Sequence, residues 1–296
     1  MRRRTLIASP GLIGLARVAA RAAPPVRVVA SFSILADMVR QIGGPTVAVT
    51  ALVGPDEDVH VYDPRPKDLR TLAEAALLVR NGLGLEGWMV RLTGSSGYKG
   101  PIVTAAQTVV PRTMTETGGE IATDPHAWQD PRNGVLYAQA IAEGLAAADA
   151  ANAPLYRDNA AAYAARIAAT GDWIEATLKP IPAADRRIIT THDAFGYYGA
   201  RYGIEFLAAE GISTEFEPSA RAIAALIAQI RREKVHAVFI EAMTSDRMAR
   251  MLARETGAAL GGTVYSDALS PSDGPAATYL EMLRHNTILF AAAMRR

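Results

Sequence analysis

The 296-residue sequence contains no cysteine, which excludes several kinds of chemistry together. Disulfide scaffolds, thiolate zinc sites, iron–sulfur clusters, cysteine nucleophiles and lipid anchors attached to cysteine all require that residue. The sequence also lacks a strong charge bias, with a formal net charge of +1, so charge gives no reason to expect a nucleic-acid partner. Half of the residues are hydrophobic, and the length suits one large or two medium globular domains.

The sequence also lacks long hydrophobic runs. A short apolar stretch near the N-terminus resembles part of an export signal. Three arginines at positions 2–4 precede a mainly apolar stretch at 6–16, and Ala20-Arg21-Ala22 follows. This layout predicts a secretory signal peptide over residues 1–22. Cleavage after Ala22 would remove five basic and no acidic residues, which leaves the mature chain net negative. The arginine pair leaves both general and twin-arginine export open. No other run approaches 18 apolar residues, so we expect no transmembrane segment in the mature chain.

The remaining sequence alternates between short β-branched runs and longer amphipathic segments. Strands are expected at 26–31, 47–53, 76–80 and 102–105, separated by helical segments. After residue 187 the alternation restarts and continues to a closing helix at 277–294. This pattern predicts an α/β fold with mainly parallel sheets. Apolar residues spaced by three or four predict a long helix over 154–178. The chain is therefore divided into an α/β lobe at 26–150, a linking helix at 151–180 and a second α/β lobe at 181–296.

Three of the five histidines stand in loops where chemistry is expected. His60 follows one expected strand, His192 follows another, and His126 lies in a proline-rich turn. Asp267 follows a strand expected at 263–266. Open α/β sheets bind ligands beyond the carboxyl ends of their strands. Three imidazoles and one carboxylate suit zinc and are tolerable for manganese.

Each loop histidine has an acid close by in the sequence. These acids are Asp58, Asp124 and Asp193, which we consider candidates for fixing the imidazole tautomers from outside the ligand set. The four candidate ligands are far apart in the chain and form no local metal motif. Spacing alone therefore leaves open that they are unrelated loop residues. His236 and His285 are expected to be ordinary packed or surface histidines.

Several segments, in order, resemble one known family. They are SFSILAD at 31–37, DVHVYDP at 58–64, NGLGLEGW at 81–88, DPHAWQDP at 124–131, THDAFGYY at 191–198 and SDALS at 266–270. The chain resembles the TroA-like (cluster A-I) solute-binding proteins of bacterial zinc and manganese ABC importers. That resemblance implies two lobes joined by a rigid helix, with metal in the cleft between them. It also implies a periplasmic receptor, expected to be a monomer, that delivers its cargo to a membrane permease.

The family's ligand positions fall on His60 and His126 in the first lobe, and on His192 and Asp267 in the second. Two departures from the family pattern bear on the cargo. The stretch at 108–123 contains no histidine, so it does not resemble the His-rich loop of many zinc receptors. His192 stands where many manganese receptors carry glutamate. We therefore expect Zn(II) as the bound cargo, with Mn(II) as the alternative.

A secreted zinc hydrolase is the competing hypothesis from a different functional class. It would need an open coordination position and a placed general base. The sequence contains neither H-E-x-x-H nor G-x-S-x-G. Glu210, Glu215 and Glu241 are acids that nothing in the sequence directs toward a metal. We therefore expect a binding protein and not an enzyme. Residues 82–87 match G-x-G-x-x-G, but 101–112 lack the acid of a dinucleotide site, which favours a tight turn.

Overall fold

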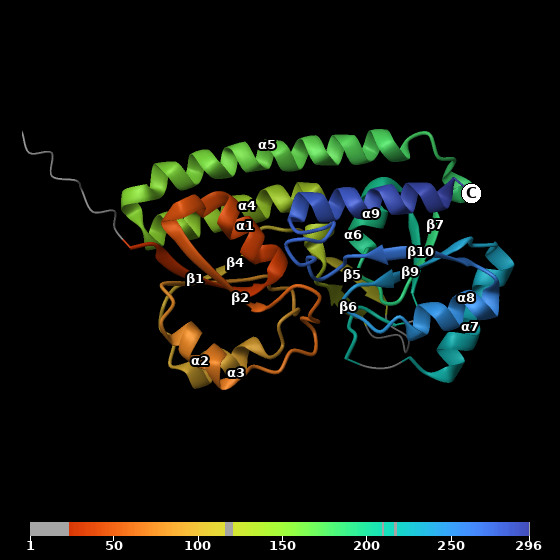
Figure 1. Cartoon of the computed structure of the whole chain (residues 1–296), viewed down its shortest axis with the longest axis horizontal. Helices are drawn as coiled ribbons and strands as arrows, with labels where there is room; N and C mark the ends of the chain where they lie inside the picture. The colour runs from red at the N-terminus through yellow and green to blue at the C-terminus, as the bar shows by residue number, and fades with distance from the viewer. Residues whose placement is uncertain (1–23, 116–120, 209, 216–217, 296) are drawn as a thin grey trace, which may run out of the picture.

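The computed structural model describes residues 24–115, 121–208, 210–215 and 218–295. The predicted signal peptide lies outside these residues. Two four-stranded sheets lie at opposite ends of the molecule (Figure 1). The sheet that precedes the long helix has the order β2–β1–β3–β4, and all of its pairings are parallel. Its strands are β1 (Val26–Phe32), β2 (Val47–Val53), β3 (Leu77–Arg80) and β4 (Ile102–Thr104).

The sheet that follows the long helix has the order β10–β9–β7–β8 and is also parallel. Its strands are β7 (Arg187–Thr190), β8 (Glu205–Ala208), β9 (Ala237–Glu241) and β10 (Ala259–Val264). The α/β prediction with parallel sheets is confirmed. The strand expected at 263–266 instead starts and ends earlier, and its register shifts between Leu260 and Thr263. Gly261 and Gly262 lie at that irregularity and hide the strand in the sequence, because glycine is depleted in strands. Asp267 therefore lies in the loop beyond β10.

The helices expected from hydrophobic periodicity are present, and two further features are not among the predictions. The predicted helices are α1 (Ser33–Gly43), α2 (Pro66–Ala73), α4 (Pro131–Ala148), α6 (Gly196–Tyr202), α7 (Ala220–Glu233), α8 (Arg247–Thr256) and α9 (Tyr279–Met294). The unpredicted features are the short helix α3 (Met89–Ser96) and the antiparallel pair β5 (Arg112–Thr115) and β6 (Ile121–Asp124).

The long helix α5 (Ala153–Leu178) joins the two halves and has 26 residues, which corresponds to about 39 Å. It runs along most of the long axis of the molecule and packs against α4, α1 and α9 (Figure 1). Its predicted apolar face is the buried one and includes Tyr156, Tyr163 and Ile167. Gly171 is buried in that face, where a Cβ would lie 3.2 Å from Pro131. This glycine therefore permits a close approach of α4.

We call the part of the chain before α5 the first lobe and the part after it the second lobe. One apolar core runs from the first sheet through α1, α4 and α5 to α9 and into the second lobe. A separate, smaller cluster lies in the second lobe between its sheet and α7 and α8. The residue boundaries proposed above for the lobes remain a prediction. None of the helices in the described ranges has the length and hydropathy of a membrane-spanning segment.

Candidate metal centre

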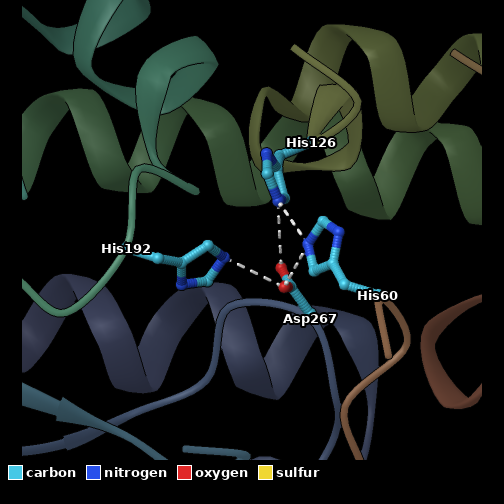
Figure 2. Close-up of side chains that lie close together, drawn as sticks. All are labelled: His60, His126, His192 and Asp267. Atoms are coloured by element: carbon cyan, nitrogen blue, oxygen red, sulfur yellow. Dashed lines mark hydrogen bonds and ion pairs between the residues drawn. The ribbon is translucent and has the colours of Figure 1, made fainter. Parts of the chain in front are cut away.

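Four loops that follow strands bring the predicted ligands together. His60 lies beyond β2, His126 beyond β6, His192 beyond β7 and Asp267 beyond β10. Figure 2 shows the three imidazoles arranged around the Asp267 carboxylate. One ligand atom from each of the four residues lies within 4.8 Å of the others. Residues far apart in the sequence therefore form one cluster between the lobes.

Several distances within this cluster are close to those between the ligand atoms of a tetrahedral zinc ion. Oδ2 of Asp267 lies 3.2 Å from Nε2 of His60 and 3.1 Å from Nε2 of His192. Its Oδ1 lies 3.6 Å from Nε2 of His126. The two first-lobe Nε2 atoms are 3.3 Å apart. Zinc bonds of about 2.0–2.1 Å in a tetrahedron would separate the ligand atoms by about 3.3 Å.

The cluster is almost entirely removed from solvent. The side chains of His126, His192 and Asp267 are fully buried, and that of His60 is 4% exposed. Both carboxylate oxygens of Asp267 are buried, and among the described residues they face the three imidazoles. A buried carboxylate is costly unless positive charge compensates it. The site is thus suited to a positive charge.

The electrostatics of the protein without metal agree with this conclusion. Burial alone would lower the pKa of His126, but the carboxylates of Asp267 and Asp124 outweigh it and raise that pKa to about 9. The pKa of His192 is likewise raised well above its usual value, because Glu241 and Asp267 overcome the effect of burial. Burial would raise the pKa of Asp267, yet His126 and His192 hold it well below its usual range. Protons therefore occupy imidazoles that a metal would need in neutral form.

Asp124, one of the acids considered from the sequence, lies beside His126. Oδ1 of Asp124 lies 2.9 Å from Nδ1 of His126 and accepts the backbone N–H of that residue at 3.0 Å. A proton on Nδ1 leaves Nε2 free as the ligand atom, which is how outer carboxylates orient metal-binding histidines. Arg112 lies 3.4 Å from the other oxygen of Asp124.

The support of His192 differs from the expectation. The acid beside its Nδ1 is Glu241, at 2.7 Å, and not Asp193. The other oxygen of Glu241 accepts the backbone N–H groups of Thr191 and His192, both at 2.9 Å. Glu241 ends β9, next to β7 in the sheet, so only the strand order could have placed it here. Among the described residues no hydrogen bond or ion pair joins the Asp193 side chain to an imidazole.

The remaining sequence candidates have other positions. Asp58 accepts the backbone N–H of His60 at 2.9 Å, so it fixes the loop and not the ring. His236 lines a separate pocket near the C-terminus. His285 lies 2.9 Å from the carbonyl oxygen of Thr263. Gly82 and Gly84 both have a φ of 88°, which supports the prediction of a tight turn at 82–87.

Comparisons with known proteins assign the chain to a family of metal-binding proteins. The family model described as ZnuA, zinc-uptake complex component A, periplasmic, matches residues 28–293. The iron-binding protein YfeA of Yersinia pestis is 32% identical over 284 residues, which cover 94% of this chain and 91% of that protein. The manganese-binding lipoprotein MntA of Halalkalibacterium halodurans is 29% identical over 91% of this chain and 88% of its own length.

Solved structures give the same result. The periplasmic zinc-binding protein TroA from Treponema pallidum matches with a TM-score of 0.86 and 27% identity, covering 93% of this chain and 100% of that one. A manganese-bound periplasmic metal-binding protein from Candidatus Liberibacter asiaticus matches with a TM-score of 0.81 and 30% identity, covering 91% and 99%. The chain therefore belongs to the ZnuA/TroA family of metal-binding receptors of ABC importers. The predicted family resemblance is confirmed.

Proposed function

We propose that this protein binds Zn(II) with high affinity in the periplasm and delivers it to the permease of an ABC importer. The observation that carries the proposal is the buried Asp267 carboxylate, which meets three imidazole Nε2 atoms at 3.1 to 3.6 Å. The ligands are His60, His126, His192 and Asp267. Two come from each lobe, so a bound ion would link the lobes.

Zinc is favoured over manganese by the chemistry of the ligand set. Imidazole nitrogen suits zinc, while manganese favours oxygen ligands, and zinc stands above manganese in the divalent affinity series. The relatives named above include iron, manganese and zinc binders, so membership of the family alone does not select the cargo. Mn(II) is the alternative cargo for the same site.

Transport is favoured over hydrolysis. Four protein ligands complete a tetrahedral zinc shell, whereas a catalytic zinc keeps one position for water. The family to which the chain belongs consists of transport receptors, and the comparisons give the hydrolase hypothesis no support. Export by the predicted signal peptide and action as a monomer are parts of the same proposal.

The test is metal analysis followed by competition. Protein purified without added metal should contain one equivalent of zinc, and competition calorimetry at one pH should show zinc binding more tightly than manganese by orders of magnitude. His192→Glu replaces a nitrogen ligand by oxygen and should narrow that preference. Tighter manganese than zinc binding in the unmutated protein would refute zinc as the cargo. Absence of binding by both metals would refute the receptor function itself.

A further inference from the structure

A pocket of about 600 Å³ lies beside the metal centre, and His60 is the one predicted ligand that lines it. First-lobe residues such as Leu83 and Thr123 form part of its wall. Second-lobe residues Ile212 and Ser213 also line it. Since the other three ligands are fully buried, a metal that exchanges with solvent through this pocket passes His60.

The carboxylate of Asp58 is one of the links between the loop that carries His60 and the second lobe; another is the backbone N–H of Asp56, which donates to the carbonyl oxygen of Leu269 at 3.1 Å. One oxygen of Asp58 accepts the backbone N–H of His60 at 2.9 Å. The other oxygen accepts the hydroxyl hydrogen of Thr214 at 2.6 Å. Asp58 thus fixes the backbone of a ligand while it holds a side chain from the opposite lobe.

The segment that carries Thr214 is in turn fixed to the loop of His192. The carbonyl oxygen of Gly211 accepts the backbone N–H of Asp193 at 3.0 Å, and that of Thr191 accepts the backbone N–H of Glu210 at 3.0 Å. These two bonds flank His192 on both sides. The His192 loop is therefore hydrogen-bonded to the segment 210–214, and Thr214 in that segment is hydrogen-bonded through Asp58 to His60.

We propose that Thr214 is a positioning residue for metal retention: its hydroxyl, through Asp58, keeps His60 on the metal while the lobes are together. The inference rests on the proposed metal-binding function. A hydroxyl that donates to a part-buried carboxylate makes a charge-assisted bond, which is stronger than a neutral one. The bond joins the two lobes, so it stabilises the closed, metal-loaded state and not the state that metal enters. Thr214 should therefore slow metal release and leave metal capture unchanged.

The experiment uses the full mature chain loaded with one equivalent of zinc. Release is followed after mixing with excess chromogenic chelator, and association is followed in a separate mixing experiment. Thr214→Val keeps the shape of the side chain and removes the donor, so release should become about tenfold faster. Association should stay within about twofold. Thr214→Ser keeps the hydroxyl and should release zinc at the rate of the unmutated protein.

The matched control is Thr177→Val. Thr177 is also half-buried, but its hydroxyl donates to the carbonyl oxygen of Trp173 within α5. This variant should release zinc at the unmutated rate. The melting temperature of each metal-free variant checks that it folds, and Thr214→Ala repeats the test should the valine variant fail to fold.

The outcomes separate this inference from the function on which it rests. If the unmutated protein does not bind zinc, the proposed function fails. If it binds zinc but Thr214→Val or Thr214→Ala releases the metal at the unmutated rate, the role of Thr214 is refuted. Release from Thr214→Ser as fast as from Thr214→Val would also overturn it, because the effect would then not depend on the hydroxyl.

Discussion

The two halves of the metal centre rest on different supports. In the first lobe, His126 is fixed by Asp124, which ends β6 two residues earlier in the chain, through both its ring and its backbone N–H. In the second lobe, His192 is fixed by Glu241 at the end of the neighbouring strand β9. The support of His126 is thus local in the chain, whereas that of His192 requires the sheet to form.

Asp267 extends this contrast, because part of its support comes from the opposite lobe. The side chains of Trp128 and Gln129 both donate to the carbonyl oxygen of Ser266, at 2.9 and 2.8 Å. These two residues follow His126 closely in the chain. The second-lobe half of the site is therefore assembled by tertiary contacts, including contacts with the first lobe. Substitutions outside the ligand loops should therefore disturb the second-lobe half of the site more than the first-lobe half.

The largest loss of zinc affinity is expected when Asp267 is replaced, because all three imidazoles, from both lobes, meet its carboxylate. Asp267→Ala removes a buried charge from the cluster, and we expect zinc to bind at least about 100-fold more weakly. Zinc should also raise the melting temperature less than in the unmutated protein, because stabilisation by a ligand follows its affinity.

The control for this change is His236→Ala, which removes a histidine that lines a different pocket. Its zinc affinity should stay within about twofold of the unmutated protein. Equal losses in Asp267→Ala and His236→Ala, measured by zinc titration, would contradict the assignment of the site.

The next largest effect on zinc affinity is expected at Glu241, which contacts His192 in space, and not at Asp193, which only follows it in the sequence. Glu241→Gln places an amide beside Nδ1 of His192 and disturbs the tautomer that leaves Nε2 free. Loss of such an outer partner weakens metal binding by about 10- to 100-fold. Asp193→Asn makes the corresponding change at the acid adjacent to His192 in sequence, and should change zinc affinity by no more than about twofold. Competition titrations of both variants decide the matter, and a larger loss in Asp193→Asn would reverse our assignment.

These pairs also show how far the sequence leads. The sequence predicts the four candidate ligands because their residue types, their place after strands and the family resemblance agree. Asp124 was considered because it lies two residues before His126 in the chain. Glu241 was considered but could not be placed, since its position beside His192 follows from the pairing of β7 with β9. Tertiary pairing of this kind leaves no mark at a fixed spacing.

The elements of the fold follow the same rule. The face of α5 was predicted because a long amphipathic helix has a clear period. Strand β10 was placed too late because Gly261 and Gly262 interrupt it. Helix α3 was not predicted, since its eight residues, MVRLTGSS, include glycine and two serines and have weak helix propensity. The β5–β6 pair was not predicted, because it is defined by its antiparallel register and not by its composition.

The last prediction concerns pH. Raising the pH should strengthen zinc binding but lower the stability of the metal-free protein. Zinc requires neutral imidazoles, yet the pKa of His126 is raised to about 9 and that of His192 well above its usual value. Zinc binding at pH 7 should therefore release protons. As the pH is lowered, zinc affinity should fall by about tenfold per pH unit for each proton displaced. Calorimetry in buffers with different ionisation enthalpies measures the number released.

In the metal-free protein the same raised pKa has the reverse consequence. A folded-state pKa of about 9 for His126, above the unfolded value of 6.5, gives stability that is complete below about pH 6.5. That contribution is lost as pH rises toward 9, so the metal-free melting temperature should fall across this window while zinc affinity rises. Asp267 contributes in the other direction, because its lowered pKa gives stability that is lost only in acid, outside the window.

Asp124→Asn removes one carboxylate that raises the pKa of His126, so this variant should release fewer protons than the unmutated protein when it binds zinc at pH 7. Proton release that is equal in the two proteins, or absent from both, would show that these carboxylates do not hold the imidazoles protonated.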